Sequence, residues 1–499
     1  MKKNIVFIAF FSLLITGCKK DYYDVGPTSS TDEAAIYSTT GNMTNVINGI
    51  YRYLYTRWSS QNQPGHGGVM LMLDFMGEDL HQERASWYTP SSGTGGWVNQ
   101  RSDSYSYVEY PFRLYYRCIG NANGILDNIV TASGPDADKA RLKGEALTMR
   151  AWAYFNLVQI YAKRYDKGTV PNSQLGVSMP LSAADVKLPR STVEEVYTQI
   201  NKDLADAITA FATASAPASG PQMKSHLNLK SAWAIRARVA LAMQDYVNAA
   251  AYAKQVIDLG GHSLMTNAQY QAGFNDLSNP EWIWGCYVQD DQGDTFGSFF
   301  GQISWDGNTS YIRGVPKRIN SALYDKITNT DIRKKMWEPS PNATNFPLPA
   351  SNYSRSPYMS RKFKVRNSPT IGDVPYIRLA EMYLTMAEAY ARTPGKEVEA
   401  RQALQTLAVN RDPSYVLSTN TGQALIDEIM VQRRVEFWAE GFRFFDLKRL
   451  NLPLDRTVVP NYVSASAGGT LQVPAGDRLW QFVIPIAEIQ ANPNSMQDP

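Results

Sequence analysis

Apolar residues recur at steps of three and four over several long stretches of the chain, the spacing of one face of an α-helix. Over residues 137–163 they form one continuous stripe: Leu142, Ala146, Met149, Ala153, Leu157 and Ile160. A similar stripe over 191–212 begins near Thr192, with Glu195 three positions later. That spacing is typical of a capping box at a helix start. Both stretches are therefore predicted to be long amphipathic helices.

Two further stretches predict pairs of helices joined by tight turns. Residues 229–258 break at Gln244-Asp245 and stop at Gly260-Gly261, while residues 375–410 break at Thr393-Pro394-Gly395. Both are rich in alanine where the helices would meet. Small side chains of this kind are typical of the closely packed helix pairs of tetratricopeptide repeats.

The chain is therefore assigned to the mostly α class, with repeat-like helix pairs at about 110–260 and 375–450 inside one domain that spans 36–499. The irregular periods and wide separation argue against a regular solenoid. Residues 261–374 are rich in Gly, Asn, Pro, Ser and aromatics, and only 282–288 has the alternation of a strand. We expect the rest of this stretch to form long ordered loops, which carry many binding surfaces.

The start of the chain has the pattern of an export signal. Two lysines precede an apolar run at 5–15, about half the length of a membrane-spanning helix. The next residues, Ile-Thr-Gly-Cys18, resemble a bacterial lipobox, in which the cysteine receives lipid. We predict a signal peptide at 1–17, lipidation at Cys18 and a flexible tether at 18–35. An ordinary signal peptide with a chance cysteine is the alternative.

Composition excludes several classes of protein. The 49 basic residues are nearly balanced by 46 acidic ones, which leaves no field suited to nucleic acid. No stretch after the signal is apolar for long enough to span a membrane. Only Cys118 and Cys286 remain after lipidation, too few for a disulfide framework, and two buried thiols are expected.

One charge cluster near the C-terminus raises the question of catalysis. Glu436 and Glu440 are four residues apart on a predicted helix, so they share a face at a spacing that a glycosidase could use. Arg433 and Arg443 lie three residues from one or the other, and arginine neighbours lower carboxyl pKa values, whereas a general acid needs a raised one. We therefore predict a structural ion-pair network without catalytic residues.

Metal and cofactor sites have little support. The four histidines are scattered and no zinc, nucleotide or serine-hydrolase motif occurs, so no cofactor is predicted. Residues 290–294, Asp-Asp-Gln-Gly-Asp, could supply oxygen ligands to calcium. They lack the spacing of an EF-hand loop, and a solvated acidic turn is the favoured interpretation.

Several aromatic residues stand in polar, glycine-containing segments that cannot form a core helix. A flat aromatic face there suits the C–H face of a sugar ring, while nearby amides, carboxylates and guanidinium groups can bind the hydroxyls. The alternatives are packing that anchors the loops and, for the polar residues, surface or capping roles. The predicted ligand-binding residues are Asp79, Arg84, Trp87, Trp97, Asn99, Trp305 and Tyr311.

Six segments, in order, give the chain its resemblance to a known family, the SusD/RagB surface lipoproteins of Bacteroidetes. The segments are YYRCIGNANGILDNI (115–129), GEALTMRAWAYFNLVQIYA (144–162), LPRSTVEEVYTQINKDLADA (188–207), IRLAEMYLTMAEAYAR (377–392), QRRVEFWAEGFRFFDLKRL (432–450) and FVIPIAEIQANPN (482–494). The chain departs from the family pattern at Gln432, where Glu is common, and in the longer link at 163–180.

The resemblance implies a SusD-like fold, with repeat-like helix pairs as scaffold and a loop-rich, irregular ligand face with a few short strands. It implies a non-enzymatic, lipid-anchored protein exposed at the outer-membrane surface. Such a protein would bind a glycan and deliver it to a SusC-like TonB-dependent transporter, with no nucleic-acid partner. A RagB-like peptide binder, a glycoside hydrolase and a helical-repeat adaptor are the alternatives.

Overall fold

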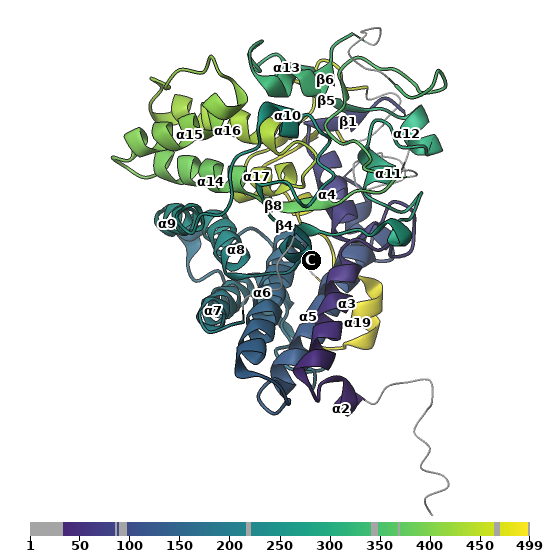
Figure 1. Ribbon diagram of the computed structural model, residues 1–499, viewed down its shortest axis with the longest axis vertical. Coiled ribbons are helices and arrows are strands. Elements are labelled where there is room, and N and C mark those ends of the chain that lie inside the picture. Colours follow the sequence, from purple (N-terminus) through teal and green to yellow (C-terminus); the bar gives the residue numbers. More distant parts are fainter. Residues whose placement is uncertain are drawn as a thin grey trace, which may run out of the picture.

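The computed structural model describes residues 33–84, 87–88, 97–215, 221–340, 348–367, 370–463 and 470–497. The predicted signal peptide, Cys18 and most of the tether lie outside the described residues. Within them, α-helices dominate and the strands are few and short. The predicted fold class, mostly α with repeat-like helix pairs and a loop-rich face, is confirmed (Figure 1).

Four long helices form the lower half of the molecule in Figure 1: α3 (Thr40–Tyr53), α5 (Ser106–Asn128), α6 (Asp136–Tyr161) and α7 (Val193–Phe211). Helix α6 packs against both α5 and α7, and its middle is buried all round. The predicted capping box at the start of α7 is present: the Thr192 side chain accepts from the Glu195 N–H and the Glu195 carboxylate accepts from the Thr192 N–H. Two of the predicted helices are therefore confirmed.

The predicted helix pairs are α8 (Leu229–Ala242) with α9 (Tyr246–Asp258), and α14 (Leu379–Ala391) with α15 (Glu397–Arg411). The first pair breaks at Gln244, which has a positive φ of 59°, and ends before Gly260, whose φ is 62°. Although far apart in sequence, the pairs meet where α9 packs on α14. Small side chains such as Ala249 and Ala389 make this close approach possible.

The loop-rich region, at the top of Figure 1, contains more regular structure than the sequence predicts. A four-stranded antiparallel sheet has the order β1 (Leu80–Gln82), β5 (Lys317–Ile319), β7 (Met359–Ser360), β6 (Trp337–Glu338). Short helices surround it: α10 (Asn267–Tyr270), α11 (Phe300–Ile303), α12 (Ser310–Gly314) and α13 (Ser321–Tyr324).

A two-stranded antiparallel sheet joins the loop-rich region to the helices. Strand β4 (Trp282–Cys286), predicted from its alternation, pairs with β8 (Val374–Arg378), which the sequence analysis missed. Both strands are buried, and the Trp284 ring packs edge-on against Trp152 of α6 at 5.1 Å between centroids. One hydrophobic core thus runs through both halves of the molecule.

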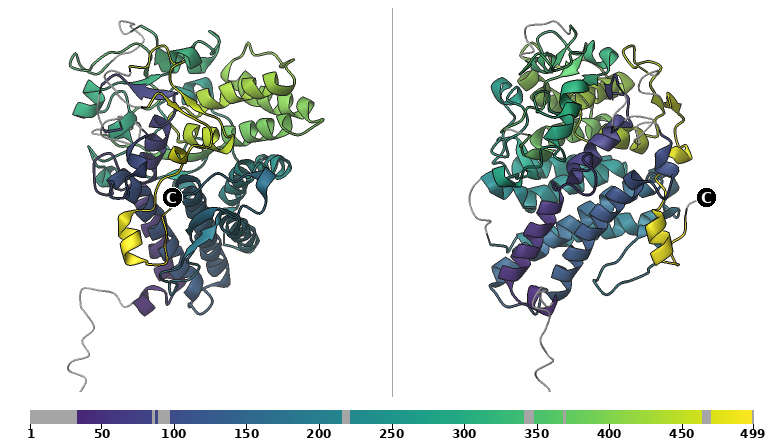
Figure 2. Two further views of the ribbon diagram at one scale, coloured as in Figure 1. Left: turned by 180° about the vertical axis from the view of Figure 1, so that it is seen from behind. Right: turned by 90° about the vertical axis from the view of Figure 1, so that its right-hand side faces the viewer.

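The remaining elements complete the body. They are α2 (Glu33–Ile36), α4 (Gly65–Phe75), α16 (Gly422–Glu436), α17 (Arg443–Arg449), α19 (Ile486–Ala491), β2 (Leu175–Ser178), β3 (Arg190–Thr192), β9 (Leu454–Asp455) and β10 (Gln472–Val473). Figure 2 shows the C-terminal segment lying along the helices of the first half. Helix α17 contacts the end of α6, where Lys448 donates to the carbonyl oxygens of Gln159 and Ala162.

Two predictions about the body can be assessed directly. Cys118 and Cys286 are both buried and unbonded to each other, as expected for two buried thiols. Among the described residues, no helix combines the length and apolar character that crossing a membrane would need.

Candidate functional site

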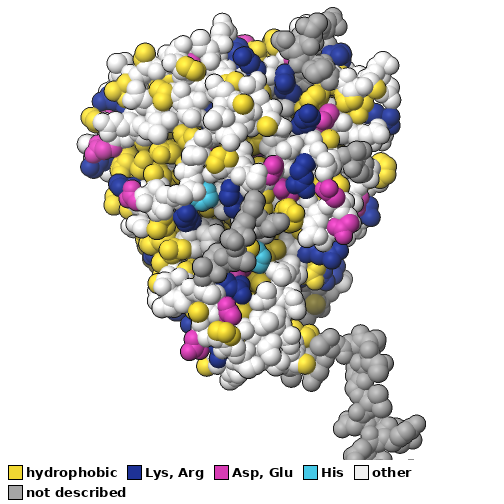
Figure 3. Space-filling view, in the orientation of Figure 1, with side chains coloured by type: hydrophobic (Ala, Val, Ile, Leu, Met, Phe, Trp, Pro, Cys, Tyr) yellow, Lys and Arg dark blue, Asp and Glu magenta, His cyan; other side chains and the backbone are white. Residues whose placement is uncertain are grey.

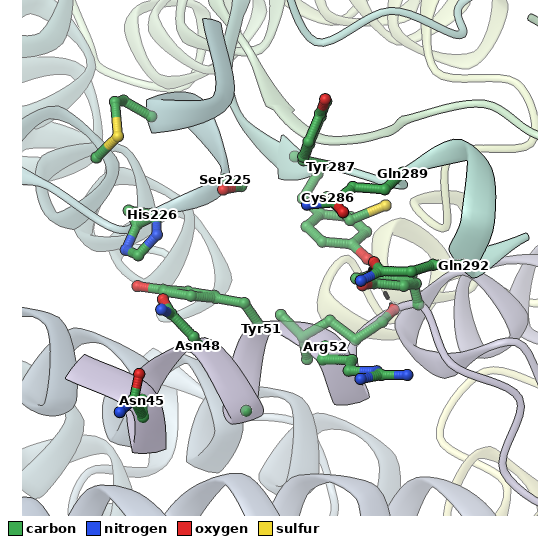
Figure 4. Close-up of a pocket in the computed structure, with 16 residues that line it drawn as sticks. Asn45, Asn48, Tyr51, Arg52, Ser225, His226, Cys286, Tyr287, Gln289 and Gln292 are labelled. Carbon is green, nitrogen blue, oxygen red and sulfur yellow. Dashed lines mark hydrogen bonds between the residues drawn. The ribbon is translucent and has the colours of Figure 1, made fainter. Parts of the chain in front are cut away.

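A cavity of about 620 Å³ opens between α3 and the end of β4, and we call it the central cleft (Figure 4). Its walls come from three segments that are distant in sequence: α3, residues 223–226, and the stretch from Gly285 to Gln292. The side chains that line it share a polar or aromatic character: Asn45, Asn48, Tyr51, Arg52, Tyr55, Ser225, His226, Tyr287, Gln289, Gln292 and Tyr376.

Helix α3 supplies one wall because of its spacing. Its apolar face buries Met43, Ile47 and Ile50 in the core. Asn48 and Arg52 fall one turn apart on another face, remain exposed, and line the cleft. In Figure 4 they rise from α3 on one side and His226 lies opposite them, while the Tyr287 side chain extends from the end of β4 away from α3. The wall is thus built on a rigid element.

The opposite wall begins where β4 ends. The Tyr287 ring is half-buried there, and the chain then turns through a short 3₁₀ segment, Asp290–Gln292. The Tyr55 hydroxyl donates to Gln292 Oε1 at 2.5 Å, which links this turn to the end of α3. Burial raises the pKa of Tyr55 to about 12, so the phenol stays protonated and remains a donor.

The floor of the cleft is held by a buried hydrogen-bond network. Tyr51 donates to Glu145 Oε2 at 2.6 Å and its oxygen accepts from the Leu227 N–H at 2.8 Å. His226 Nδ1 lies 3.0 Å from the same carboxylate oxygen, and Arg141 pairs with the other at 2.7 Å. Burial, followed by the Glu145 charge, raises the pKa of Tyr51 well above its usual value. The network therefore fixes residues 226–227 against α3 and α6.

The cleft is lined by hydrogen-bonding groups. None of the described residues that line it is Asp or Glu. Cys286 is no nucleophile at neutral pH because burial raises its pKa to about 12. The Tyr376 hydroxyl donates to the Leu54 carbonyl oxygen at 2.8 Å. The remaining amide, guanidinium and hydroxyl groups of the lining can hydrogen-bond to a polar ligand.

The carboxylates that resembled a glycosidase pair lie elsewhere and are structural, as predicted. Glu436 is fully buried and pairs with Arg378 at 2.8 Å, Arg411 at 3.0 Å and Arg333 at 3.2 Å. Burial alone would raise its pKa, but these guanidinium groups hold it well below its usual range. Arg378 also pairs with Glu440 at 2.7 Å. A general acid is therefore excluded at Glu436.

The predicted pairing partners within this cluster need correction. Arg433 pairs with Asp446 at 2.8 Å, and Arg443 pairs with Glu78, so neither contacts Glu436 or Glu440 as the helical spacing suggested. The helix ends at Glu436 and the chain turns, because Ala439 and Gly441 adopt positive φ values of 61° and 84°.

Three of the predicted ligand residues, Asp79, Trp97 and Tyr311, are buried in contacts with the protein itself. Asp79 accepts from Arg434 Nε at 2.8 Å. Trp97 is 1% exposed, donates to the Met76 carbonyl oxygen at 2.8 Å and packs on Trp480. Buried side chains offer no face to a ligand, so for Trp97 the structure favours the packing alternative. Asp79 is neither a surface nor a capping residue, because it is buried in an ion pair with Arg434.

Tyr311 is the third buried residue, since it donates to Gln82 Oε1 at 2.9 Å and its ring lies 3.4 Å from the Lys317 ammonium nitrogen. Its place on a short helix beside β5 explains the burial. Trp305 is half-buried, and its backbone N–H donates to the Phe363 carbonyl oxygen at 3.1 Å. For Tyr311 too, packing is the interpretation that the structure favours.

Two of the other predicted residues, Trp87 and Asn99, lie near one pair of tyrosines. Trp87 is 41% exposed, and its carbonyl oxygen accepts from the Tyr107 hydroxyl at 2.6 Å. Tyr107 stacks on Tyr105 with centroids 5.3 Å apart, and Asn99 hydrogen-bonds to Tyr105. Arg84 is exposed, and it precedes Trp87 by three residues in sequence. We call Trp87, Asn99, Tyr105 and Tyr107 the Trp87 patch.

The acidic run considered for calcium is engaged by the protein. Asp290 accepts from the Asn367 side-chain amide at 3.0 Å, and Asp294 accepts from the Gly297 N–H at 2.8 Å and pairs with Arg57 at 3.2 Å. Across the described ranges, no group of three or more His, Cys, Asp or Glu residues is placed to hold a metal ion. Nothing in this geometry argues for a metal at the run.

Sequence reasoning missed the cleft residues on α3. Asn45, Asn48 and Arg52 recur at helical spacing opposite the apolar stripe, as the solvent-facing residues of any amphipathic helix do. That face becomes a cleft wall only because the end of β4 and residues 223–226 lie opposite it in the folded protein. The aromatic residues Tyr55 and Tyr287 were visible, but their spacing carried no distinguishing signal.

Comparison with known proteins adds relatives of similar length. A family model described as "Starch-binding associating with outer membrane" matches residues 21–241, and one described as "SusD family" matches 262–499. A SusD-like protein P38 of Formosa agariphila is 24% identical over 492 residues, which cover 90% of this chain and 91% of that protein.

Solved structures agree with the family models. A SusD-like carbohydrate-binding protein from Bacteroides vulgatus is 26% identical with a TM-score of 0.76, covering 92% of this chain and 98% of that one. A SusD superfamily protein from Bacteroides thetaiotaomicron, 23% identical with a TM-score of 0.74 and coverage of 92% and 100%, shares the fold. With both halves matched and the fold shared throughout, the chain belongs to the SusD/RagB family.

Proposed function

We propose that this protein is a cell-surface lipoprotein of the outer membrane that captures an oligosaccharide in the central cleft and delivers it to a SusC-like TonB-dependent transporter. The observation that carries the proposal is the lining of the cleft: tyrosines, amides and an arginine, with no carboxylate among the described lining residues. Relatives described as starch-binding and carbohydrate-binding support the same ligand class.

The chemistry of the cleft suits a sugar. Half-buried tyrosine rings such as Tyr55 and Tyr287 present flat apolar faces, and Asn48, Gln289 and Arg52 can bond to hydroxyl groups around them. The volume of about 620 Å³ lies within the range of small-ligand sites and would hold a few sugar residues. The Trp87 patch, with its exposed indole, would supply a second contact for a longer chain.

The family and the start of the sequence support the proposed lipid anchor and the proposed transporter partner. Lipid on Cys18 and a tether at 18–35 would hold the body at the membrane surface. In that arrangement the protein acts by binding, without covalent chemistry, and the transporter performs uptake. Membership of the SusD/RagB family supports these assignments.

The test is calorimetric titration of the purified lipoprotein in detergent with a panel of neutral and acidic glycans and with peptides, while product formation is monitored. We expect saturable glycan binding without cleavage. Tyr287→Ala should weaken binding about tenfold by removing a stacking face. Tyr383→Ala, at a half-buried tyrosine on α14, is the matched control and should leave binding unchanged. Binding of peptides alone would replace the proposal with a RagB-like role, and glycan turnover would make the protein an enzyme.

A further inference from the structure

A second cavity, of about 370 Å³, continues from the central cleft. Met223 and His226 line both cavities, so the two share a wall. Basic side chains line the second cavity: Arg141, Lys224 and Lys230. We call it the basic cavity. Figure 3 shows Lys, Arg and His side chains gathered near the middle of the same face of the molecule.

The two lysines of the basic cavity are not neutralised. Lys224 Nζ donates to the backbone carbonyl oxygen of Asn279 at 2.6 Å and makes a longer contact with that of Ser278. Lys230 Nζ lies against Gly261, where an added β-carbon would come within 2.8 Å of it. Neither ammonium group has a carboxylate within 4.0 Å in the part of the chain that the structure describes.

The carboxylate that lines the basic cavity is already occupied. Glu145 pairs with Arg141 at 2.7 Å and accepts from Tyr51 at 2.6 Å, and His226 lies 3.0 Å from it. Arg141 and Glu145 therefore offset each other. The charge left over in the cavity is that of the two lysines.

The lowered pKa values of these lysines also indicate a site that an anion would stabilise. Burial lowers the pKa of Lys230, and no opposing charge offsets it; burial lowers the pKa of Lys224 too, with Asp276 as a weaker opposing charge. Between them, burial and the two lysines lower the pKa of His262 to about 4, so that ring is neutral at pH 7. A half-buried ammonium group without a paired carboxylate costs free energy that a bound anion would offset in part.

We infer that the basic cavity binds the anionic substituent, a carboxylate or a sulfate ester, of an acidic glycan whose neighbouring sugars occupy the central cleft. This inference rests on the proposed function and narrows its ligand to charged glycans. Lys224 and Lys230 are the charge-recognising residues, and His226 lies at the junction of the two cavities. Tyr51 and Glu145 position the junction from below.

The test uses two glycan pairs that differ in charge: an oligogalacturonate with its carboxyl-reduced derivative, and a κ-carrageenan oligosaccharide with its desulfated derivative. Binding to the full lipoprotein in detergent is measured at about 50 mM and about 500 mM salt. We expect at least one acidic member to bind about tenfold more tightly than its neutral derivative at low salt, with a smaller difference at high salt. The pair that shows the difference identifies the carboxylate or the sulfate as the anion.

The variants locate the effect. Lys230→Gln, and the double variant that adds Lys224→Gln, should remove most of the difference in affinity between the acidic glycan and its neutral derivative. Both variants should keep a thermal stability near that of the parent. Lys326→Gln removes the same charge at an exposed position after α13, at the far end of the molecule, and should keep the difference.

Equal affinity within both pairs, or a difference that survives in the double variant, would overturn the inference. A panel in which a neutral glycan binds and neither acidic probe does would overturn it as well, while the proposed function stands. A panel in which no glycan binds would remove the proposed function and the inference together.

Discussion

The hydroxyl of Tyr55 donates to Gln292 Oε1 at 2.5 Å, and this side-chain contact connects the end of α3 to the turn after β4 at the edge of the central cleft. The two residues are 237 positions apart in sequence. One wall of the cleft belongs to a long helix and the other to a turn, and the contact helps to hold the second wall in place.

Tyr55→Phe removes that contact and keeps the ring. We expect glycan affinity to fall about threefold to tenfold, because the turn that carries Gln289 and Gln292 is freed, and the free energy of unfolding to fall by about 1 kcal/mol. Calorimetry and urea unfolding measure the two effects. Gln292→Ala should give a similar loss, and the double variant little more, as a double-mutant cycle of coupled residues requires. Full additivity of the two losses would show that the contact does not hold the cleft.

Trp87→Ala and Trp97→Ala separate a surface aromatic from a core one. Trp97 is buried against Trp480, so its truncation should destabilise the protein by about 3–5 kcal/mol. Trp87 is 41% exposed, and its truncation should cost stability far less. Thermal unfolding checks both, and a large loss of stability in Trp87→Ala would mean that its ring supports the loop instead of facing a ligand.

The same two tryptophans show where sequence reasoning about the site stopped. Both stand in polar segments, and nothing local distinguishes them. Trp97 is buried because Met76 and Trp480, one of them almost 400 positions away, close around it. Burial of this kind depends on long-range packing, which one sequence does not display. The Trp87 patch was predictable in part, since Trp87 and Asn99 do come close to the same tyrosine pair.

The sequence predicts the fold better than it predicts the candidate site. Helices α6, α7, α8 and α9 and strand β4 follow from periodicity, capping and glycine stops within a few residues of their observed bounds. Strand β8 was missed because Val374–Arg378 runs directly into α14, and a short apolar run beside a helix has no periodicity of its own. Its identity as a strand comes from pairing with β4.

Gly285→Ala should disrupt that pairing. A β-carbon at Gly285 would lie 2.6 Å from the Val374 carbonyl oxygen, so the two strands would have to separate. We expect a loss of about 1–3 kcal/mol, as for other overpacked sites, measured by urea unfolding. Gly120→Ala, in α5 with no atom within 4 Å of the added carbon, is the matched control and should stabilise the helix by about 0.5–1 kcal/mol. If Gly285→Ala and Gly120→Ala changed the free energy of unfolding equally, the close approach of β4 and β8 would be contradicted.

Asp446 makes the free energy of unfolding depend on pH in the acid range. It is buried, which alone would raise its pKa, but Arg433 at 2.8 Å and Arg449 at 2.9 Å lower it to about 2. The folded pKa lies below the usual value of 3.8, so this contribution is fully present above about pH 5 and is lost as the pH falls toward 2. The contribution amounts to about 2 kcal/mol.

Asp446→Asn should lower stability at pH 7 by about 3–5 kcal/mol, because two buried guanidinium groups lose their partner. Its free energy of unfolding should also fall less steeply than that of the parent between pH 5 and pH 2. Asp206→Asn, at an exposed carboxylate paired with Lys202, is the control and should follow the parent curve closely. Parallel curves for Asp446→Asn and the parent would show that another carboxylate governs the acid limb.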